Sequence, residues 1–542
     1  MTRKNFPGAL DFQSLKRRER RAPCALRGIG SWSLKFLWML VLGAWCFCFP
    51  VHAATNQNIL LIIADDYGAD GSSLYNTTNN GASLPPTPNI NTLAQRGVTF
   101  RYGYANPVCS PTRAAILTGR HAFRTGVGDV IAGVGSATLK ASEFTLPDAF
   151  AAAAPGYSLA SFGKWHLANG PNSPAIIGGW PHHAGTIIGE LPNYTNWTKT
   201  VNGVATPNHT NYATTDVVDD AVAWMQSRSG SNWFAWVAFN APHTPFHKPP
   251  QNLCPSYPAN TLTNSRRQFE AMCEAMDTEI GRLLTAVNLT NTHVIFIGDN
   301  GTQGNIIQPP YSSAHRQDTL YEGGTRVPFI IAGPAVVGTN RFTDTRAHVV
   351  DLFATILEMA GLNVATVTTN VTIDSQSLLP ALQSTNAIAR YVFAQKFDTN
   401  TPTSADGRVL RNDQFKLLDF DDGHDEFYDL SADPDEQTNL LGGALTTAQS
   451  ANYYSLVLKL GDYQNALTAP VIAAYSLNGN QFTATVPRVT NLTYSLWRAP
   501  EFGALAWSPL TNAVVVTGPS NVTLTNTNAP DVSQYYRVEA RP

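Results

Sequence analysis

The stretch Asn58-Ile59-Leu60-Leu61-Ile62-Ile63-Ala64 decides the fold class of this chain. An almost unbroken apolar run bounded by turn residues is typical of a strand buried on both faces, as in a parallel sheet covered by helices. Similar runs at 157–162, 233–239, 293–297 and 329–332 are expected to be further strands.

Helical patterns separate these runs. They occupy residues 111–117, 215–228, 266–287 and 348–361. Strands that alternate with helices predict an α/β fold with a mostly parallel central sheet flanked by helices.

The residue composition and pattern of the chain change twice after this region, which predicts a multidomain protein. Short segments rich in acids and turns indicate a smaller C-terminal α+β subdomain, and short alternating strands with few charges then indicate a small all-β module. The expected division is 1–53 for a secretory signal, 54–385 for the main domain, 386–467 for the subdomain and 471–542 for the module.

Composition excludes two broad classes. Hydrophobic residues make up 43% of the 542 residues, so a large core can form and global disorder is excluded. The net charge is −3, but nine of the basic residues lie within residues 1–35, and the rest of the chain carries a net −10. An acidic body without a basic stripe argues against nucleic-acid binding.

The N-terminal segment resembles an export signal. Residues 36–51 form an apolar run that is too short for a comfortable membrane span, follows a basic segment and ends in Val51-His52-Ala53-Ala54. We therefore expect a secreted or periplasmic protein with no stable membrane span in the mature chain. A retained N-terminal anchor is the alternative.

Three cysteines remain after that segment: Cys109, Cys254 and Cys273. The odd number suggests that one of them is special in an oxidising compartment. Cys254 and Cys273 lie on either side of a predicted helix start, so a local disulfide between them is the expectation.

Chemically active residues follow four of the predicted strands. In parallel sheets, ligands bind beyond the carboxyl ends of the strands. The residues found there are Asp65 and Asp66, Lys164 and His166, His243, and Asp299 and Asn300. The three aspartates and Asn300 are hard oxygen ligands, which favour Ca²⁺ or Mg²⁺ over zinc. The alternative is ordinary turns, in which Asp and Asn are common.

The segment Cys109-Ser110-Pro111-Thr112-Arg113 is the most distinctive feature. Ser110 suits an N-cap and Pro111 the first helical turn, which places Cys109 at a helix N-terminus, where backbone amides attract anions. The guanidinium group of Arg113 has the forked geometry that suits binding of sulfate or phosphate. A low-pKa structural or redox thiol is the alternative.

This segment, followed by Leu117-Thr118-Gly119, resembles the signature of the type I, formylglycine-dependent sulfatases of the alkaline phosphatase superfamily, and the chain is arylsulfatase-like over about residues 56–465. Further motifs follow in family order: Asp65-Asp66, Gly163 to Leu167, Pro242-His243, Asp299 to Gly301, Glu322 to Pro328, and Phe427 to Leu440.

The resemblance implies a role for each matching residue. A separate formylglycine-generating enzyme would oxidise Cys109 to formylglycine, whose hydrated aldehyde is the nucleophile on sulfur. Arg113 and Lys164 would orient this group, His243 would stand near the leaving oxygen, and His166 would take a proton as sulfate is expelled. A calcium ion would be held by Asp65, Asp66, Asp299, Asn300 and the modified Cys109.

One position departs from the family pattern. Members usually carry a second sulfate-binding lysine where this chain has Gln317, preceded by His315 and Arg316. Either Arg316 or His315 occupies the vacated space, or the sulfate pocket has one cation fewer. His182 and His183 are candidates for the leaving-group pocket, with packing in a loop as the alternative.

The resulting prediction is a secreted, calcium-dependent sulfatase that acts on a sulfated small molecule or, preferably, a sulfated polysaccharide or other carbohydrate. A phosphonate or phosphate-diester hydrolase of the same superfamily is the first alternative. A catalytically decayed, sulfate-binding homologue is the second.

Overall fold

The computed structural model describes residues 57–77, 81–133, 135–398 and 401–464, and parts of 474–541. The proposed signal, residues 1–53, lies outside this set. Among the described residues, no helix combines the length and the apolar character needed to cross a bilayer.

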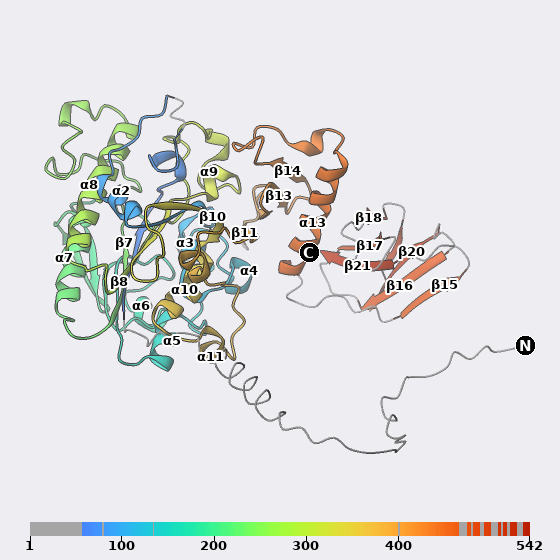
Figure 1. Ribbon diagram of the computed structural model, residues 1–542, viewed down its shortest axis with the longest axis horizontal. Helices are drawn as coiled ribbons and strands as arrows, with labels where there is room; N and C mark the ends of the chain where they lie inside the picture. Colours follow the sequence, from blue (N-terminus) through green and yellow to red (C-terminus); the bar gives the residue numbers. More distant parts are fainter. Residues whose placement is uncertain are drawn as a thin grey trace, which may run out of the picture. The chain divides into compact units, whose positions relative to one another are not determined.

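A ten-stranded sheet forms the centre of the main domain (Figure 1). Its strands, in spatial order, are β10 (Arg341–His348), β2 (Gly97–Tyr104), β9 (Phe329–Ala332), β8 (Thr292–Gly298), β1 (Asn58–Ala64), β7 (Trp233–Ala238), β3 (Ser158–Lys164), β4 (His183–Thr186), β5 (Trp197–Val201) and β6 (Val204–His209).

The five neighbouring strands β8, β1, β7, β3 and β4 are all parallel to one another. Antiparallel pairs lie outside them, where β9 meets β8 and β2, and where β5 meets β4 and β6. The predicted α/β class with a mostly parallel central sheet is therefore confirmed, and the four principal predicted strands agree with β1, β3, β7 and β8 to within two residues at either end.

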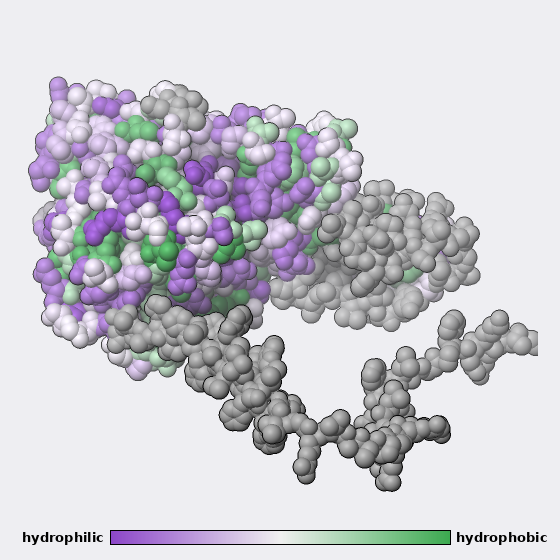
Figure 2. Space-filling model, in the orientation of Figure 1, coloured by the Kyte–Doolittle hydropathy of each residue, from purple (hydrophilic) through white to green (hydrophobic). Residues whose placement is uncertain are grey.

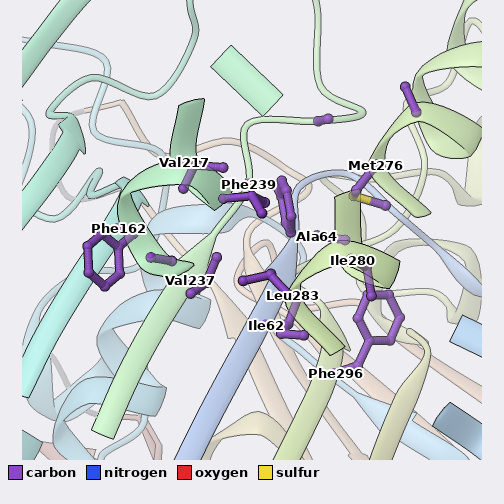
Figure 3. Close-up of a cluster of buried hydrophobic side chains, with 14 of the residues drawn as sticks. Ile62, Ala64, Phe162, Val217, Val237, Phe239, Met276, Ile280, Leu283 and Phe296 are labelled. Atoms are coloured by element: carbon purple, nitrogen blue, oxygen red, sulfur yellow. The ribbon is translucent and has the colours of Figure 1, made fainter. Parts of the chain in front are cut away.

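Helices cover both faces of the sheet, as the side chains of β1 show. Leu60, Ile62 and Ala64 pack toward α2 (Pro88–Gln95), α7 (Ala213–Gln226) and α8 (Ser265–Thr285); part of this layer is shown in Figure 3. Ile59, Leu61 and Ile63 pack toward α3 (Cys109–Thr118), α5 (Leu146–Ala153) and α10 (Leu352–Met359). Because successive side chains of a strand point to opposite faces, burial on both faces requires the apolar run that the sequence shows.

A second, antiparallel sheet follows in the order β11 (Val392–Lys396), β12 (Gly407–Arg411), β13 (Phe415–Phe420), β14 (Asp425–Asp429), with α13 (Thr447–Gln464) packed on it. The short helices are α4 (Ala122–Thr125), α6 (Ser173–Ile176), α9 (Glu322–Thr325), α11 (Val364–Val367), α12 (Leu379–Gln383), η1 (Ala69–Gly71), η2 (Ala259–Thr261), η3 (Ser313–His315), η4 (Val349–Asp351) and η5 (Leu440–Gly442).

Among the described residues after 473, the C-terminal part contains strands but no helix, and the strands form two small antiparallel sheets. The strands are β15 (Ala474–Asn478), β16 (Gln481–Pro487), β17 (Thr493–Ala499), β18 (Ser508–Pro509), β19 (Val514–Thr517), β20 (Asn521–Asn526) and β21 (Tyr535–Arg541). Small antiparallel sheets at the C-terminus agree with the predicted fold class. The visible face of the described chain mixes hydrophilic and apolar residues (Figure 2), as folded protein surfaces ordinarily do.

The predicted disulfide is wrong. Cys254 and Cys273 are both buried free thiols, and Cys254 Sγ lies 3.6 Å from the Pro250 carbonyl oxygen. Cys273 belongs to the buried face of α8. Each thiol therefore behaves as a small apolar core residue.

Candidate active site

Four parallel strands deliver the polar residues to one edge of the sheet. Asp65 and Asp66 follow β1, Asp299 and Asn300 follow β8, Lys164 ends β3, and His243 lies in the loop after β7. Since Ala64 of β1 pairs with Gly298 of β8, the two acidic motifs start side by side.

The three aspartates form a compact buried cluster. Each offers a carboxylate oxygen, and these oxygens lie within 4.8 Å of one another. Asp66 adopts a left-handed backbone conformation, with φ of 60°, which is uncommon for non-glycine residues, although aspartate tolerates it better than most. Its amide donates to Oδ1 of Asp299 at 3.1 Å, and Asn300 Nδ2 donates to Oδ1 of Asp66 at 2.7 Å.

Two buried oxygens of this cluster fit a cation. Asp65 Oδ1 and Asn300 Oδ1 accept no hydrogen bond from the described residues, although buried polar atoms are nearly always paired. Carboxylate and amide oxygens suit Ca²⁺ or Mg²⁺. The donor set therefore fits a hard divalent ion held by Asp65, Asp66, Asp299 and Asn300.

Two buried cations are paired with the cluster. Arg113 donates from Nε and Nη2 to Oδ2 of Asp299, at 3.2 and 2.8 Å, and Lys164 Nζ lies 2.6 Å from Oδ2 of Asp65. Burial, followed by the charge of Asp65, raises the pKa of Asp299, although Arg113 lowers it. With all five groups ionised, the cluster carries a net charge of −1, which a divalent cation changes to +1.

Cys109 is the first residue of α3 and is 3% exposed. The helix starts earlier than predicted: Val108, not Ser110, is the N-cap, and Ser110 Oγ instead accepts a hydrogen bond from the Ile131 amide. Burial is the main cause that raises the pKa of the Cys109 thiol to about 12. The alternative of a low-pKa redox thiol is therefore not supported.

Two histidines approach this centre from different strands. His166 Nδ1 lies 3.1 Å from Cys109 Sγ, and its Nε2 lies 3.1 Å from the Ile131 carbonyl oxygen. His243 Nε2 lies 3.8 Å from Oδ2 of Asp66. Burial, then Lys164 and Arg113, lowers the pKa of His166. Burial also lowers that of His243, but the Asp66 and Asp65 charges outweigh it, so the pKa of His243 is raised.

A cavity of about 400 Å³ opens onto Cys109. The predicted residues that line it are Cys109, His166, His243 and Gln317. Sequence reasoning missed the rest of the wall, which consists of Val130, Ile131, Ala132, Gly133, Ala168, Asn169, Ile187, Ile188, Gly189 and Glu190. Residues 187–190 follow the carboxyl end of β4, so recognising that strand would have pointed to them.

The position of Gln317 corrects one expectation. Its Nε2 donates to Oδ1 of Asp66, whereas His315 stacks on Tyr321 at 3.9 Å and Arg316 Nη1 donates to the Gln317 carbonyl at 3.2 Å. Neither His315 nor Arg316 lines the cavity. Consecutive loop residues point in different directions, and here Gln317 itself reaches the acidic cluster.

Gln303 contacts the acidic cluster but was not predicted from the sequence. Its Nε2 donates to Oδ2 of Asp66 at 2.8 Å. The available signal was its place three residues after Asn300, in the same loop.

His182 and His183 do not reach the cavity. His183 begins β4 and pairs in register with Ser161, while the carboxyl end of this pair of strands lies three residues further on, at Lys164 and Thr186. The His183 Nδ1 lies 2.9 Å from Ser161 Oγ. Both histidines thus lie toward the wrong end of the strand, and the packing alternative describes them better.

The α/β fold, the buried acidic cluster, the paired cations and the cavity that opens onto Cys109 define a hydrolase-type site for an anionic group. The chain belongs to the sulfatase family. Residues 57–362 match the family model described as "Sulfatase", and residues 315–459 match "N-sulphoglucosamine sulphohydrolase, C-terminal". The protein is therefore a sulfuric ester hydrolase.

Relatives named as sulfatases include one from Formosa agariphila, which is 28% identical over 72% of this chain and 85% of its own. N-acetylgalactosamine-6-sulfatase from Rattus norvegicus is 27% identical over 63% of this chain and 68% of its own. The solved structure of Ps i-CgsB in complex with k-i-k-neocarrahexaose shares the fold, with a TM-score of 0.65, 22% identity and coverage of 76% of this chain and 93% of that one.

Proposed function

We propose that this protein is an exported, calcium-dependent sulfatase that removes sulfate esters from carbohydrates through a formylglycine derived from Cys109. The observation that carries the proposal is the meeting of Cys109, His166, Arg113 and the acidic cluster at one buried point. Relatives support a carbohydrate substrate, since one is named for N-acetylgalactosamine and another structure holds D-glucosamine-2-N,6-O-disulfate.

A bound Ca²⁺ would supply positive charge that attracts the sulfate and stabilises negative charge at the nucleophile. Asp65, Asp66, Asp299 and Asn300 would hold it. The pairing of Arg113 with Asp299 and of Lys164 with Asp65 keeps those carboxylates oriented. Without the ion, the net charge of −1 in the cluster would repel a sulfate.

The two histidines suit opposite proton transfers. His166 faces residue 109 with Nδ1, and its lowered pKa keeps it neutral, as a proton acceptor must be. His243 lies at the cavity wall with a raised pKa. It is therefore suited to donate a hydrogen bond or a proton to the leaving oxygen.

The test is sulfate release from a panel of sulfated saccharides by protein co-expressed with a formylglycine-generating enzyme, in parallel with phosphate diesters and phosphonates. Peptide mass spectrometry should find the aldehyde at Cys109 and unmodified thiols at Cys254 and Cys273. Active protein that carries only a thiol at Cys109 would contradict the mechanism. Faster hydrolysis of the phosphorus esters would favour the alternative hydrolase, and no hydrolysis at all the decayed homologue.

A further inference from the structure

We propose that the outer part of the Cys109 cavity selects a leaving group without a second negative charge, and that Glu190 is the residue that enforces this selection. The inference rests on the proposed sulfatase function. It narrows the substrate class to sugars that carry the scissile sulfate as their only anionic group, in contrast to uronate-containing or multiply sulfated saccharides.

The cavity wall is largely apolar away from the acidic cluster. Ile188 and Val130 line it and remain 51% and 39% exposed. Ile131 and Ile187 also line it. Aliphatic side chains pack well against the C–H faces of a sugar ring or against an aromatic ring, and they offer no partner to a carboxylate or a second sulfate.

Glu190 is the one carboxylate among the described residues that line the cavity. Its side chain is exposed, and Oε1 accepts a hydrogen bond from Thr244 Oγ1 at 2.8 Å. A carboxylate has further acceptor sites beyond that single bond. It can therefore accept a hydrogen bond from a sugar hydroxyl while it repels an anionic substituent.

No lysine or arginine is among the described residues that line the cavity. Lys396 Nζ lies 2.8 Å from Asp318 and 3.8 Å from Asp129, which adjoin the cavity residues Gln317 and Val130. Arg316 donates to a backbone carbonyl. Arg113 and Lys164 are fully buried against Asp299 and Asp65. Arg113, Lys164 and Lys396 are each paired with a carboxylate. Arg316 keeps further N–H donors but does not line the cavity, so none of these side chains is a lining anchor for a second anionic group.

The experiment uses two aryl sulfates of similar shape, 4-carboxyphenyl sulfate and the neutral 4-carbamoylphenyl sulfate, with protein that carries the modified Cys109. Glu190→Gln keeps an acceptor oxygen for Thr244, removes the negative charge and replaces the other carboxylate oxygen by an amide NH2 group. Its ratio of kcat/KM for the neutral ester over the anionic ester should fall roughly three- to tenfold relative to wild type, as expected for charges several ångströms apart near a surface. Added salt should lower the wild-type ratio toward one, because it screens the repulsion between Glu190 and the anionic ester.

Asp462→Asn is the matched control, because it makes the same change of charge on α13, outside the cavity, and should leave the ratio unchanged. A ratio that Glu190→Gln does not move, or that falls equally in the control, would overturn the inference while sulfatase activity stands. Failure of the proposed function differs, because neither the sulfated saccharides nor the two aryl esters would then be hydrolysed by any variant, and this inference would fall with it.

Discussion

Gln317 donates a hydrogen bond from Nε2 to Oδ1 of Asp66, the same oxygen that accepts from Asn300 Nδ2. The residue that replaces the family lysine is therefore in contact with the proposed metal ligands. The resemblance to the sulfatase family predicts a lysine at this position, and this chain has a neutral donor there instead.

The first prediction follows from that contact. Gln317→Lys should raise kcat/KM for a sulfate ester, by up to about tenfold, because a charge-assisted hydrogen bond exceeds a neutral one by roughly 1 kcal/mol or more. Arg316→Ala should change it less than about twofold, a difference worth only about 0.4 kcal/mol, since its guanidinium binds a backbone carbonyl. Steady-state kinetics on one substrate measures both. A large loss in Arg316→Ala would restore the compensation hypothesis.

The second prediction concerns the metal. Calcium at about 100 times its Kd should stabilise the wild type by about 2.7 kcal/mol. Asn300→Ala should lose most of this effect, because it removes the unpaired Oδ1. The measurement is the shift in Tm between chelator and added calcium.

Asp277→Asn provides the comparison for the metal test. Asp277 is a buried carboxylate that accepts hydrogen bonds from Asn89 and Ile90, away from the cluster. This variant should be less stable but keep the full calcium shift. An equal shift in Asn300→Ala and wild type would argue against the proposed ligand set.

The third prediction tests the support of His166. A Cβ added at Gly189 would lie 2.2 Å from Cε1 and 2.4 Å from Nε2 of that ring. Gly189→Ala should therefore displace His166 and lower kcat by at least about tenfold, within the range that general acid–base groups contribute. Gly156→Ala, where a Cβ meets nothing within 4 Å, should leave kcat unchanged. Equal rates in the two variants would contradict the geometry.

The fourth prediction is a loss of stability in acid. Burial lowers the pKa of His121 and of His183 to about 3 and that of His293 to about 4. Below about pH 6.5 the unfolded chain binds protons that the folded chain excludes. The free energy of unfolding should therefore fall, by up to about 1.4 kcal/mol per pH unit for each such histidine.

Urea titrations between pH 7 and pH 5, with calcium saturating, measure this slope. His121 packs among Phe123, Phe393 and Tyr463, so His121→Phe preserves the aromatic contacts. The slope reports how many protons the chain takes up on unfolding, and in this variant that number should be smaller by about one. An unchanged slope would show that His121 does not contribute.

The core strands and the acidic motifs were predictable from the sequence because their causes are local. A strand buried on both faces is typically apolar at successive positions, and β1, β7 and β8 show that pattern, whereas β3 includes Ser158 and Ser161. In a parallel sheet the carboxyl ends share one edge, so residues 65, 66, 299 and 300 were expected at the same edge; the pairing of β1 with β8 makes them neighbours. In the segment Cys109 to Arg113, Ser110 and Pro111 indicated the start of a helix.

Only the tertiary structure decided which of His315, Arg316 and Gln317 faces the cluster. The direction of a loop side chain depends on its contacts in the folded chain, here with Tyr321 for His315 and with the distant Asp66 for Gln317. The same reason applies to Cys254 and Cys273, because their spacing in the sequence does not determine how far apart they lie in space. Glu190 became visible only once β4 placed it beside Thr244, 54 residues away. The sequence determined which chemistry gathers at the sheet edge; long-range packing determined the wall around it.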